Sequence, residues 1–318
     1  MISIIMQNTS TGEIYDISQL VTNISWDTVR IGKPAELSFA MVIEKGLEIS
    51  EGSIIYFIKD DTKIFYGYIF KISRTSDETL SITAYDQMRY LLNKDTFVFK
   101  NKRADEIVQK IATDFNIRTG VLENTSYKIP LMVEDGQTLI DIIYKSIDNT
   151  LINTGEMYVL YDSFGSLTLK NIKSMFNNLI IGDESLLTSY SFDRSIDGDS
   201  FNKIKLYKDN KNTGKREVFI VKDSSNINKW GLLQYYEKVN DKLNEAQIRK
   251  RAEQLVFVKN RVEKGLSLDC IGDLSVRAGT SIYVDIKGME LKQRFIVDSA
   301  KHSFSNNQHT MSLTLKVI

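Results

Sequence analysis

The sequence is poor in cysteine, carries no excess charge of either sign and contains no long apolar run. Its single cysteine, Cys270, cannot form a disulfide within the chain, which is typical of proteins made in a reducing cytoplasm. The 41 basic and 41 acidic residues balance, and a neutral chain is a poor fit for a protein whose main role is to bind phosphate backbones. The longest apolar runs, such as residues 54–58, hold five residues, whereas a membrane helix needs about twenty. Residues 1–6 lack a basic segment, so we expect neither a signal peptide nor membrane insertion.

The composition is that of a globular protein. Apolar residues make up 42% and charged residues 26% of the 318 positions, which argues against disorder, collagen and coiled coil. A chain of this length corresponds to about two domains. It can bury roughly three quarters of its unfolded surface, so it needs no disulfides to be stable.

Strand patterns dominate the first part of the chain. Residues 53–58, 63–72 and 79–84 are rich in Ile, Tyr, Phe and Thr, and turn signals separate them. Helical periodicity then appears on a face formed by Ala104, Ile107, Val108, Ile111 and Phe115.

A second helix is predicted from residue 138 to about residue 147, because Thr138 and Asp141 have the spacing of a capping box. A short hairpin is predicted over residues 157–170. The middle of the chain is therefore expected to be a small α+β domain.

Strands resume at about residue 188 and continue to the C-terminus, interrupted by one helix expected at about residues 241–259. The apolar face of this helix consists of Ile248, Ala252, Leu255 and Val256. The neighbouring Arg249-Lys-Arg251 is either a phosphate-binding patch or a solvated helix face, and the sequence favours the second interpretation.

An internal repeat is the most informative signal. Ile24-Ser-Trp-Asp27 resembles Tyr190-Ser-Phe-Asp193, and in both copies a glycine follows the aromatic residue by six positions. We match the strands that come next, Leu37-Ser-Phe-Ala-Met41 and Ile204-Lys-Leu-Tyr207. Three further matches follow in the same order: Gly52-Ser-Ile-Ile-Tyr-Phe57 with Gly279-Thr-Ser-Ile-Tyr-Val284, Tyr68-Ile-Phe-Lys-Ile72 with Arg294-Phe-Ile-Val-Asp298, and Thr79-Leu-Ser-Ile-Thr83 with Thr310-Met-Ser-Leu-Thr314.

This shared order predicts a mainly β chain in which two related β-barrels or sandwiches flank a small α+β domain. A barrel or folded sheet also limits the exposed strand edges that a flat sheet would leave open. The expected domains are residues 1–97, residues 98–187, and residues 188–318 with the inserted helix.

Residues with catalytic or metal-binding chemistry are few. His302 and His309 are predicted to bracket a hairpin tip, where they either share a metal or serve a structural role; the sequence favours the structural role because no cysteine lies near. Cys270 lies in an alternating strand pattern without a partner that would activate a thiol. The GxGxxG, P-loop and GxSxG motifs are missing.

Residues 193–199 resemble half of a calcium loop, but position twelve of that loop is Ile204 instead of the bidentate glutamate. The repeat offers a simpler interpretation, since Asp193 and Gly198 match Asp27 and Gly32. We expect no catalytic residues, no metal and no cofactor. A pair of carboxylates for glycoside hydrolysis remains open as an alternative, although the sequence favours no particular pair.

Several stretches resemble XkdQ-like phage tail proteins, the baseplate hub proteins of contractile phage tails and related bacteriocins. These stretches span almost the whole chain in order: Ala84-Tyr-Asp-Gln-Met-Arg-Tyr-Leu-Leu-Asn-Lys-Asp95, Ala104-Asp-Glu-Ile-Val-Gln-Lys-Ile-Ala112, Glu134-Asp-Gly-Gln-Thr-Leu139, Thr154-Gly-Glu-Met-Tyr-Val-Leu-Tyr-Asp162, Asp209-Asn-Lys-Asn-Thr-Gly214 and Trp230-Gly-Leu-Leu-Gln234.

The resemblance implies a protein related to late-control D and type VI secretion hub proteins, with two tube-like β domains in each subunit of a homotrimer. It implies a pseudo-hexameric ring that joins the tail tube to a central spike and templates tube assembly. The implied partners are the tail tube, spike and baseplate wedge proteins and the tape-measure protein, with DNA at most passing through the ring. The implied location is the baseplate of a particle assembled in the bacterial cytoplasm.

Two other functions stay open at this point. One is a tail-associated cell-wall hydrolase. The other is a carbohydrate-binding tail-tip protein, for which exposed aromatic residues would be the signature; Tyr235 and Tyr236 near Trp230 form the dense aromatic group of the sequence, and packing in a strand core explains it better.

Overall fold

The computed structural model describes residues 1–44, 46–74, 79–210, 214–241 and 243–317. The chain divides into two compact units. The main unit consists of Met1–Ser191 and Ser267–Ile318, and the inserted unit consists of Phe192–Leu266. The domain boundaries expected from the sequence remain predictions. None of the helices in the described part of the chain is long and apolar enough to cross a membrane.

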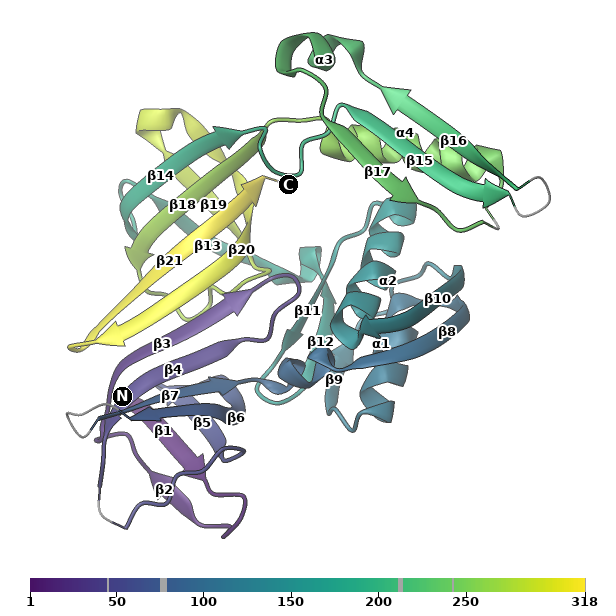
Figure 1. Cartoon of the computed structure of the whole chain (residues 1–318). Helices are drawn as coiled ribbons and strands as arrows, with labels where there is room; N and C mark the ends of the chain where they lie inside the picture. The colour runs from purple at the N-terminus through teal and green to yellow at the C-terminus, as the bar shows by residue number, and fades with distance from the viewer. Residues whose placement is uncertain (45, 75–78, 211–213, 242, 318) are drawn as a thin grey trace. The chain divides into compact units, whose positions relative to one another are not determined.

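The main unit begins with a curved antiparallel sheet, which we call the first β module (Figure 1). Its strands are β1 (Ile2–Gln7), β2 (Ile14–Asp16), β3 (Val21–Val29), β4 (Glu36–Val42), β5 (Ile54–Lys59), β6 (Thr62–Arg74) and β7 (Thr79–Tyr85), in the order β3-β4-β7-β6-β5-β1-β2. Alternating side chains point inward, so Trp26, Phe39 and Phe57 from three strands share one buried core. The sheet therefore folds around its own core.

An α+β part follows, as the sequence predicted. It contains the 3₁₀ helix η1 (Gln87–Leu92), β8 (Lys94–Lys102), α1 (Ala104–Asp114), β9 (Thr119–Leu122), β10 (Ile129–Thr138), α2 (Leu139–Thr154), β11 (Tyr158–Asp162) and β12 (Leu167–Asn171). Strands β8 and β10 pair with each other, and β11, β12 and β9 form a second small sheet. Both helices contribute to one apolar core.

Helix α2 is longer than predicted. The expected end near residue 147 is wrong, because the helix continues to Thr154 and ends at Gly155, whose φ of 74° only glycine adopts without strain. The polar residues beyond Ile147 fit inside the helix, since the Thr150 hydroxyl donates to the Ser146 carbonyl at 3.0 Å.

The second β module follows the α+β part in the sequence. After the 3₁₀ helix η2 (Ile172–Met175) it is formed by β13 (Phe176–Gly182), β14 (Leu187–Ser195), β18 (Glu263–Ile271), β19 (Ser281–Ile286), the 3₁₀ helix η3 (Lys287–Met289), β20 (Leu291–Ser305) and β21 (Gln308–Val317). Its strand order is β14-β18-β21-β20-β19, and β13 pairs with the far side of β19.

The two modules repeat one another. The order β3-β4-β7-β6-β5 in the first corresponds to β14-β18-β21-β20-β19 in the second. In both, a glycine with positive φ, Gly52 or Gly279, donates its N–H across to the fourth strand at 2.8 Å, to Ile69 or Val297. The ladder between the third and fourth strands has a bulge at the same place in both modules. It lies directly after Ile69 in the β6–β7 ladder and directly after Val297 in the β20–β21 ladder.

The structure corrects one match of the predicted repeat. Leu37 lies in β4, whose counterpart is β18 and not the strand around Ile204, because β18 pairs with β14 as β4 pairs with β3. The match of Tyr68 with Arg294 was also two residues out of register, since Ile69 corresponds to Val297.

The inserted unit separates β14 from β18. It contains the sheet β16-β15-β17, formed by β15 (Lys203–Asn210), β16 (Lys215–Lys222) and β17 (Gln234–Lys238), together with α3 (Ser224–Trp230) and α4 (Glu245–Lys259). The predicted apolar face of α4 is confirmed: Ile248 and Ala252 pack against Ile204 and Leu206 of β15 in a small core.

Candidate functional site: the joint between the two β modules

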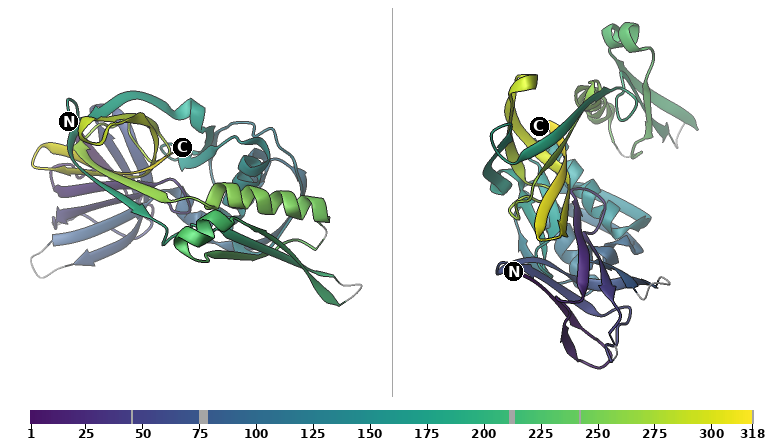
Figure 2. Two further views of the ribbon diagram at one scale, coloured as in Figure 1. Left: turned by 90° about the horizontal axis from the view of Figure 1, so that it is seen from above. Right: turned by 90° about the vertical axis from the view of Figure 1, so that its left-hand side faces the viewer.

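The two β modules are joined edge to edge by strands far apart in the sequence. Strand β3 pairs antiparallel with β20, and the ladder runs from Val29 opposite Ser299 to Ile24 opposite Phe304. Figures 1 and 2 show these strands side by side, purple against yellow. The ladder makes the two modules parts of one continuous sheet. We call the contacts along it the joint.

Aromatic packing fills the inner face of the joint. Trp26 lies opposite His302 in the ladder, and their ring centroids are 5.0 Å apart. Phe304 packs edge to face on Phe57 of β5 at 5.2 Å, so it belongs to the core of the first module. The joint is therefore a packed interior and not a solvated contact.

The two histidines form a hydrogen-bonded pair inside this joint. His302 is fully buried, and its Nε2 lies 2.9 Å from the Val276 carbonyl oxygen, which can only accept, so Nε2 carries the proton. His302 Nδ1 then accepts from His309 Nε2 at 2.9 Å. Burial and the neighbouring His309 lower the pKa of His302 to about 4, and burial and Lys59 lower the pKa of His309 to about 4. Both rings are neutral at pH 7.

This pairing supports the structural role for the histidines. Both nitrogens of His302 already have hydrogen-bond partners, so a metal would have to displace one of them. Within the described residues no cluster of three or more His, Cys, Asp or Glu side chains is placed to hold a metal ion.

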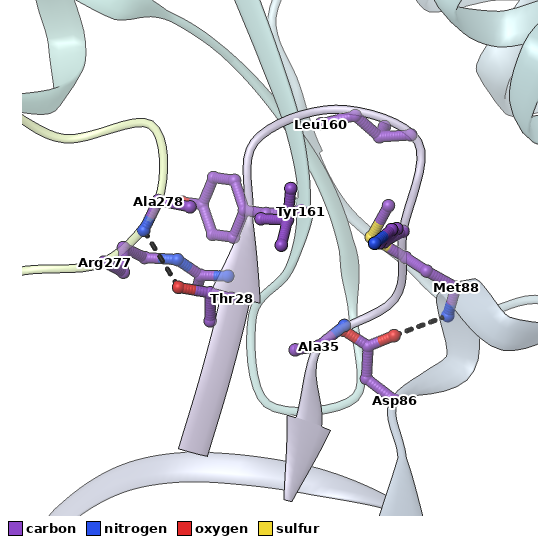
Figure 3. Close-up of a pocket in the computed structure, with 10 residues that line it drawn as sticks. Thr28, Ala35, Asp86, Met88, Leu160, Tyr161, Arg277 and Ala278 are labelled. Atoms are coloured by element: carbon purple, nitrogen blue, oxygen red, sulfur yellow. Dashed lines mark hydrogen bonds between the residues drawn. The ribbon is translucent and has the colours of Figure 1, made fainter. Parts of the chain in front are cut away.

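Polar contacts close the end of the joint. The Arg30 side chain forms an ion pair with Asp298 at 2.8 Å, and the Arg30 N–H donates to the Asp298 carbonyl at 2.9 Å. Tyr144 of α2 donates its hydroxyl to the Arg30 carbonyl at 2.8 Å. Thr28 accepts from the Ala278 N–H at 3.0 Å (Figure 3). The α+β part thus contacts the same ladder end that connects the two modules.

A buried charge cluster lies beside this end. Asp86 accepts from the backbone N–H groups of Ala35 at 3.0 Å and Met88 at 2.9 Å. Asp162 accepts from the Gln87 side chain at 2.7 Å. Arg277 donates to the Asp162 carbonyl at 3.1 Å and lies 4.1 Å from the centre of the Tyr161 ring. The cluster thus brings together the start of η1, the end of β11 and the connection before β19.

The surroundings of the cluster support a structural role. Burial raises the pKa of Asp86 well above its usual range, and the neighbouring Asp162 adds to this shift. Burial also raises the pKa of Asp162. A perturbed pair of carboxyls is a common sign of catalysis, but the cavity beside Asp86 and Arg277 measures about 10 Å³ (Figure 3), room for one water molecule and not for a substrate.

A larger hollow lies at the other end of the joint. It measures about 510 Å³ and is lined by residues of β1, β3 and the β20–β21 hairpin. The ionisable side chains among its lining residues are Lys59 and His309. The second of these is neutral at pH 7, so the hollow offers no acid–base pair.

The other residues singled out in the sequence have structural surroundings. Cys270 is buried in β18, and burial raises the pKa of its thiol to about 12, so the thiol is unreactive. Asp193 lies at the end of β14, and Gly198 follows in the connection, as Asp27 and Gly32 do after β3. Both pairs thus lie at equivalent strand connections, which supports the simpler interpretation of the half calcium loop.

The basic and aromatic groups lie in the inserted unit. Arg249 is exposed and pairs with Glu245 at 2.8 Å, as expected for a solvated helix face. Arg251 differs from this expectation, because it is partly buried and pairs with Glu237 of β17 at 2.9 Å. Tyr235 packs on Phe201 in the core, as predicted. The same prediction was wrong for Tyr236, which is 48% exposed and stacks on Tyr207 at 4.8 Å.

The candidate site residues that the sequence missed are those of the joint and of the charge cluster beside it. Asp86, Asp162 and Arg277 lie in three separate stretches, and no spacing connects them. The signal for β18 was present, since Leu266-Ser-Leu268 matches Leu37-Ser-Phe39 as well as any pair in the repeat.

Comparison with known proteins gives a consistent picture. The model of the YQBQ-like family matches residues 24–316. The chain is 34% identical over 304 residues to YqbQ of Bacillus subtilis strain 168, covering 93% of this chain and 92% of YqbQ. It is 35% identical over 301 residues to XkdQ of the phage-like element PBSX from the same strain, covering 92% of this chain and 90% of XkdQ.

Solved structures share the fold at low sequence identity. The 43 kDa tail protein of prophage MuSo2 from Shewanella oneidensis has a TM-score of 0.71 and 15% identity, with 98% of each chain covered. A tail protein from Neisseria meningitidis MC58 has a TM-score of 0.72 and 13% identity, covering 99% of this chain and 96% of its own. An E. coli type VI secretion component has a TM-score of 0.55 and 10% identity, covering 94% of this chain and 73% of its own.

Proposed function

Because the chain belongs to the YQBQ-like family, we propose that it is a structural protein of the baseplate in a contractile phage tail or a phage-tail-like bacteriocin. Its relative XkdQ is a protein of a phage-like element, and the tail proteins with the same fold point to the same kind of particle. In the finer form of this proposal the chain is the hub. Three copies form a ring that joins the tail tube to the central spike and templates tube assembly.

The observation that carries the hub proposal is the repeated module. One chain holds two β modules with the same strand order, joined edge to edge. Three chains therefore supply six similar modules. The six modules of such a ring match the six-fold symmetry of a hexameric tube. The α+β part and the inserted unit occur once per chain, so they match the three-fold symmetry of a trimeric spike.

The proposed partners follow from this arrangement. The tail tube protein binds one side of the ring, the spike protein binds the other, and wedge proteins and the tape-measure protein contact the assembly. The E. coli type VI component with the same fold is described as structurally similar to the T4 tail proteins gp27 and gp5, which supports the comparison with a tube-to-spike connector. DNA at most passes through the ring, and a lumen without excess positive charge would let it pass.

We propose no enzymatic activity. The buried carboxyls Asp86 and Asp162 adjoin a cavity of about 10 Å³, and the buried Cys270 thiol is protonated at neutral pH because its pKa is raised to about 12. A cell-wall hydrolase would show lysis in a zymogram on purified peptidoglycan. Lysis that disappears when Asp86 or Asp162 is replaced would contradict this part of the proposal.

The test of the hub is the mass of the assembly. The chain is produced together with the spike protein of the same particle, and the complex is measured by light scattering and native mass spectrometry. We expect three copies of the 36.4 kDa chain for each spike trimer, and a ring in electron micrographs. A complex that holds one or two copies, or a spike that never binds, would refute the hub.

A further inference from the structure

Within the described residues, strand β14 has an unpaired edge. It pairs with β18 on one side and ends the order of the sheet on the other (Figure 1). Residues 188–194 are exposed on both faces, including Tyr190 and Phe192. Its counterpart β3 occupies the same place in the first module, yet Trp26 and Thr28 of β3 are buried, because β3 pairs with β20. An exposed strand with unpaired N–H and C=O groups is a template for another strand.

Strand β6 carries a second open edge. Its counterpart β20 pairs with β21 and β19 and, through residues 299–304, also with β3. Strand β6 pairs with β7 and β5 in the same way, but its pairing toward β5 stops at Ile69, which exchanges hydrogen bonds with Gly52 and Ser53. Beyond that point, residues 71–74 have no strand partner on this side in the described part of the chain.

We propose that β14 of one chain adds to the open edge of β6 in a second copy of this chain. This proposal rests on the proposed function and identifies its interface. The contact between β3 and β20 relates the first module to the second. If the second module of one chain is related to the first module of the next chain in the same way, β14 pairs with β6. Strand β14 is the counterpart of β3, and β6 is the counterpart of β20. The added strand pairing is antiparallel, as in the joint.

The repeat also gives the register of this contact. Within the chain, Trp26 lies opposite His302 and Asp27 lies opposite Lys301. Phe192 and Asp193 correspond to Trp26 and Asp27. Arg74 and Ser73 correspond to His302 and Lys301, because Ile69 corresponds to Val297. Phe192 of one chain is therefore placed opposite Arg74 of the next, and Asp193 opposite Ser73.

The chemistry of these pairs suits a buried contact between copies. Phe192 is 40% exposed in the single chain, and a guanidinium such as that of Arg74 packs well on an aromatic ring. At the end of the ladder, the ion pair between Arg30 and Asp298 corresponds to Ile196 and Phe70, two apolar residues that are only half buried. Pairing would remove both from water.

The contact is heterologous, because each chain offers β14 at one end and β6 at the other. Such contacts repeat until a ring closes. With two modules per chain, every contact around the ring is either the joint or its copy between chains. Three chains close a ring of six modules when each step turns by one sixth of a circle.

A pair of cysteines tests this register. The double variant Ser73→Cys/Asp193→Cys places two thiols directly opposite one another, at the distance that a cross-strand disulfide spans. The native Cys270 is buried with its pKa raised to about 12, so it does not compete. The matched control is Asp27→Cys/Lys301→Cys, which places thiols at the corresponding pair within one chain.

The variants are produced with the spike protein and oxidised mildly. For Ser73→Cys/Asp193→Cys we expect most of the protein to run as covalent dimers and trimers on a non-reducing gel. The single variants should remain uncrosslinked, and the control should form its disulfide within one chain. A three-copy complex that forms under reducing conditions but gives no link between chains would overturn the β14–β6 contact and leave the hub proposal intact. If the wild-type chain forms no three-copy complex with the spike, the hub proposal itself fails.

Discussion

Lowering the pH from 7 to 5 is expected to destabilise the joint through His302. Its pKa is about 4 in the folded chain, against an ordinary value of 6.5. The unfolded state therefore binds more protons between these two values, and the free energy of unfolding falls as the pH falls through this window. The stabilising contribution is complete above about pH 6.5. At pH 5 the loss from this one group is about 2 kcal/mol.

The groups around the pair determine this shift. His302 faces Trp26 across the ladder and the Val276 carbonyl from the connection before β19. His309 and Asp273 also act on His302, the first lowering and the second raising its pKa, and Lys59 lowers the pKa of His309. Burial and the neighbouring His309 outweigh the effect of Asp273 on His302, so this ring stays largely neutral at pH 5.

Urea unfolding followed by circular dichroism at pH 7 and pH 5 measures the effect, with His302→Gln as the comparison. Carboxyl groups elsewhere titrate in both proteins, so their effect on the free energy of unfolding cancels in the comparison. The wild type should lose about 2 kcal/mol more than the variant on this change of pH. The double variant His302→Gln/His309→Gln separates the two rings. Equal losses in wild type and variant would refute the conclusion that His302 is buried as a neutral ring.

Three further outcomes are expected. Trp26→Ala should lower the free energy of unfolding by about 3–5 kcal/mol, because it empties a buried aromatic position at the joint; the matched change Phe257→Ala, at a residue that is 87% exposed, should stay within about 0.5 kcal/mol. A similar small loss at Trp26 would contradict its place in the core. Cys270 should resist iodoacetamide in the folded chain at pH 8 and react on unfolding, as followed by mass spectrometry; rapid labelling of the native chain would show that it is not buried. Phe192→Ala should leave the thermal midpoint of the isolated chain unchanged. It should weaken assembly with the spike at least tenfold, which is about 1.4 kcal/mol, as measured by light scattering over a dilution series. Unchanged assembly would count against the contact between Phe192 and Arg74.

Much of the fold could be predicted from the sequence, because local patterns carry it. The strands β3, β5 and β7 were matched with β14, β19 and β21, and the helix around Ile107 followed from its apolar spacing. The match of Leu37 failed for a physical reason. In the sequence, β14 is followed by β15 of the inserted unit, and β18 comes only after that unit. A short alternating pattern does not show which of these two strands pairs with β14.

The contacts of the joint could not be predicted from local sequence patterns. Trp26 and His302 meet only because two edge strands pair across almost the whole length of the chain. Arg277 donates to the Asp162 carbonyl, which lies 115 positions away in the sequence. Polar side chains such as Asp86 look like any turn residue in the sequence, and their burial follows from the packing of three separate parts. The repeat predicted two modules but did not predict which edges they would share.

The place of the inserted unit has a consequence for how such a chain tolerates new material. In the first module the connection between β3 and β4 spans only residues 30–35, while the equivalent connection in the second spans residues 196–262. Lengthening a loop costs little free energy once its ends are held by paired strands, so a whole folded segment occupies this position without disturbing the ladder on either side. The short connection of the first module has no such freedom, because Arg30 at its start pairs with Asp298 and the Ala35 N–H at its end donates to Asp86. New material is therefore better added within the inserted unit, where it would appear three times around the proposed assembly.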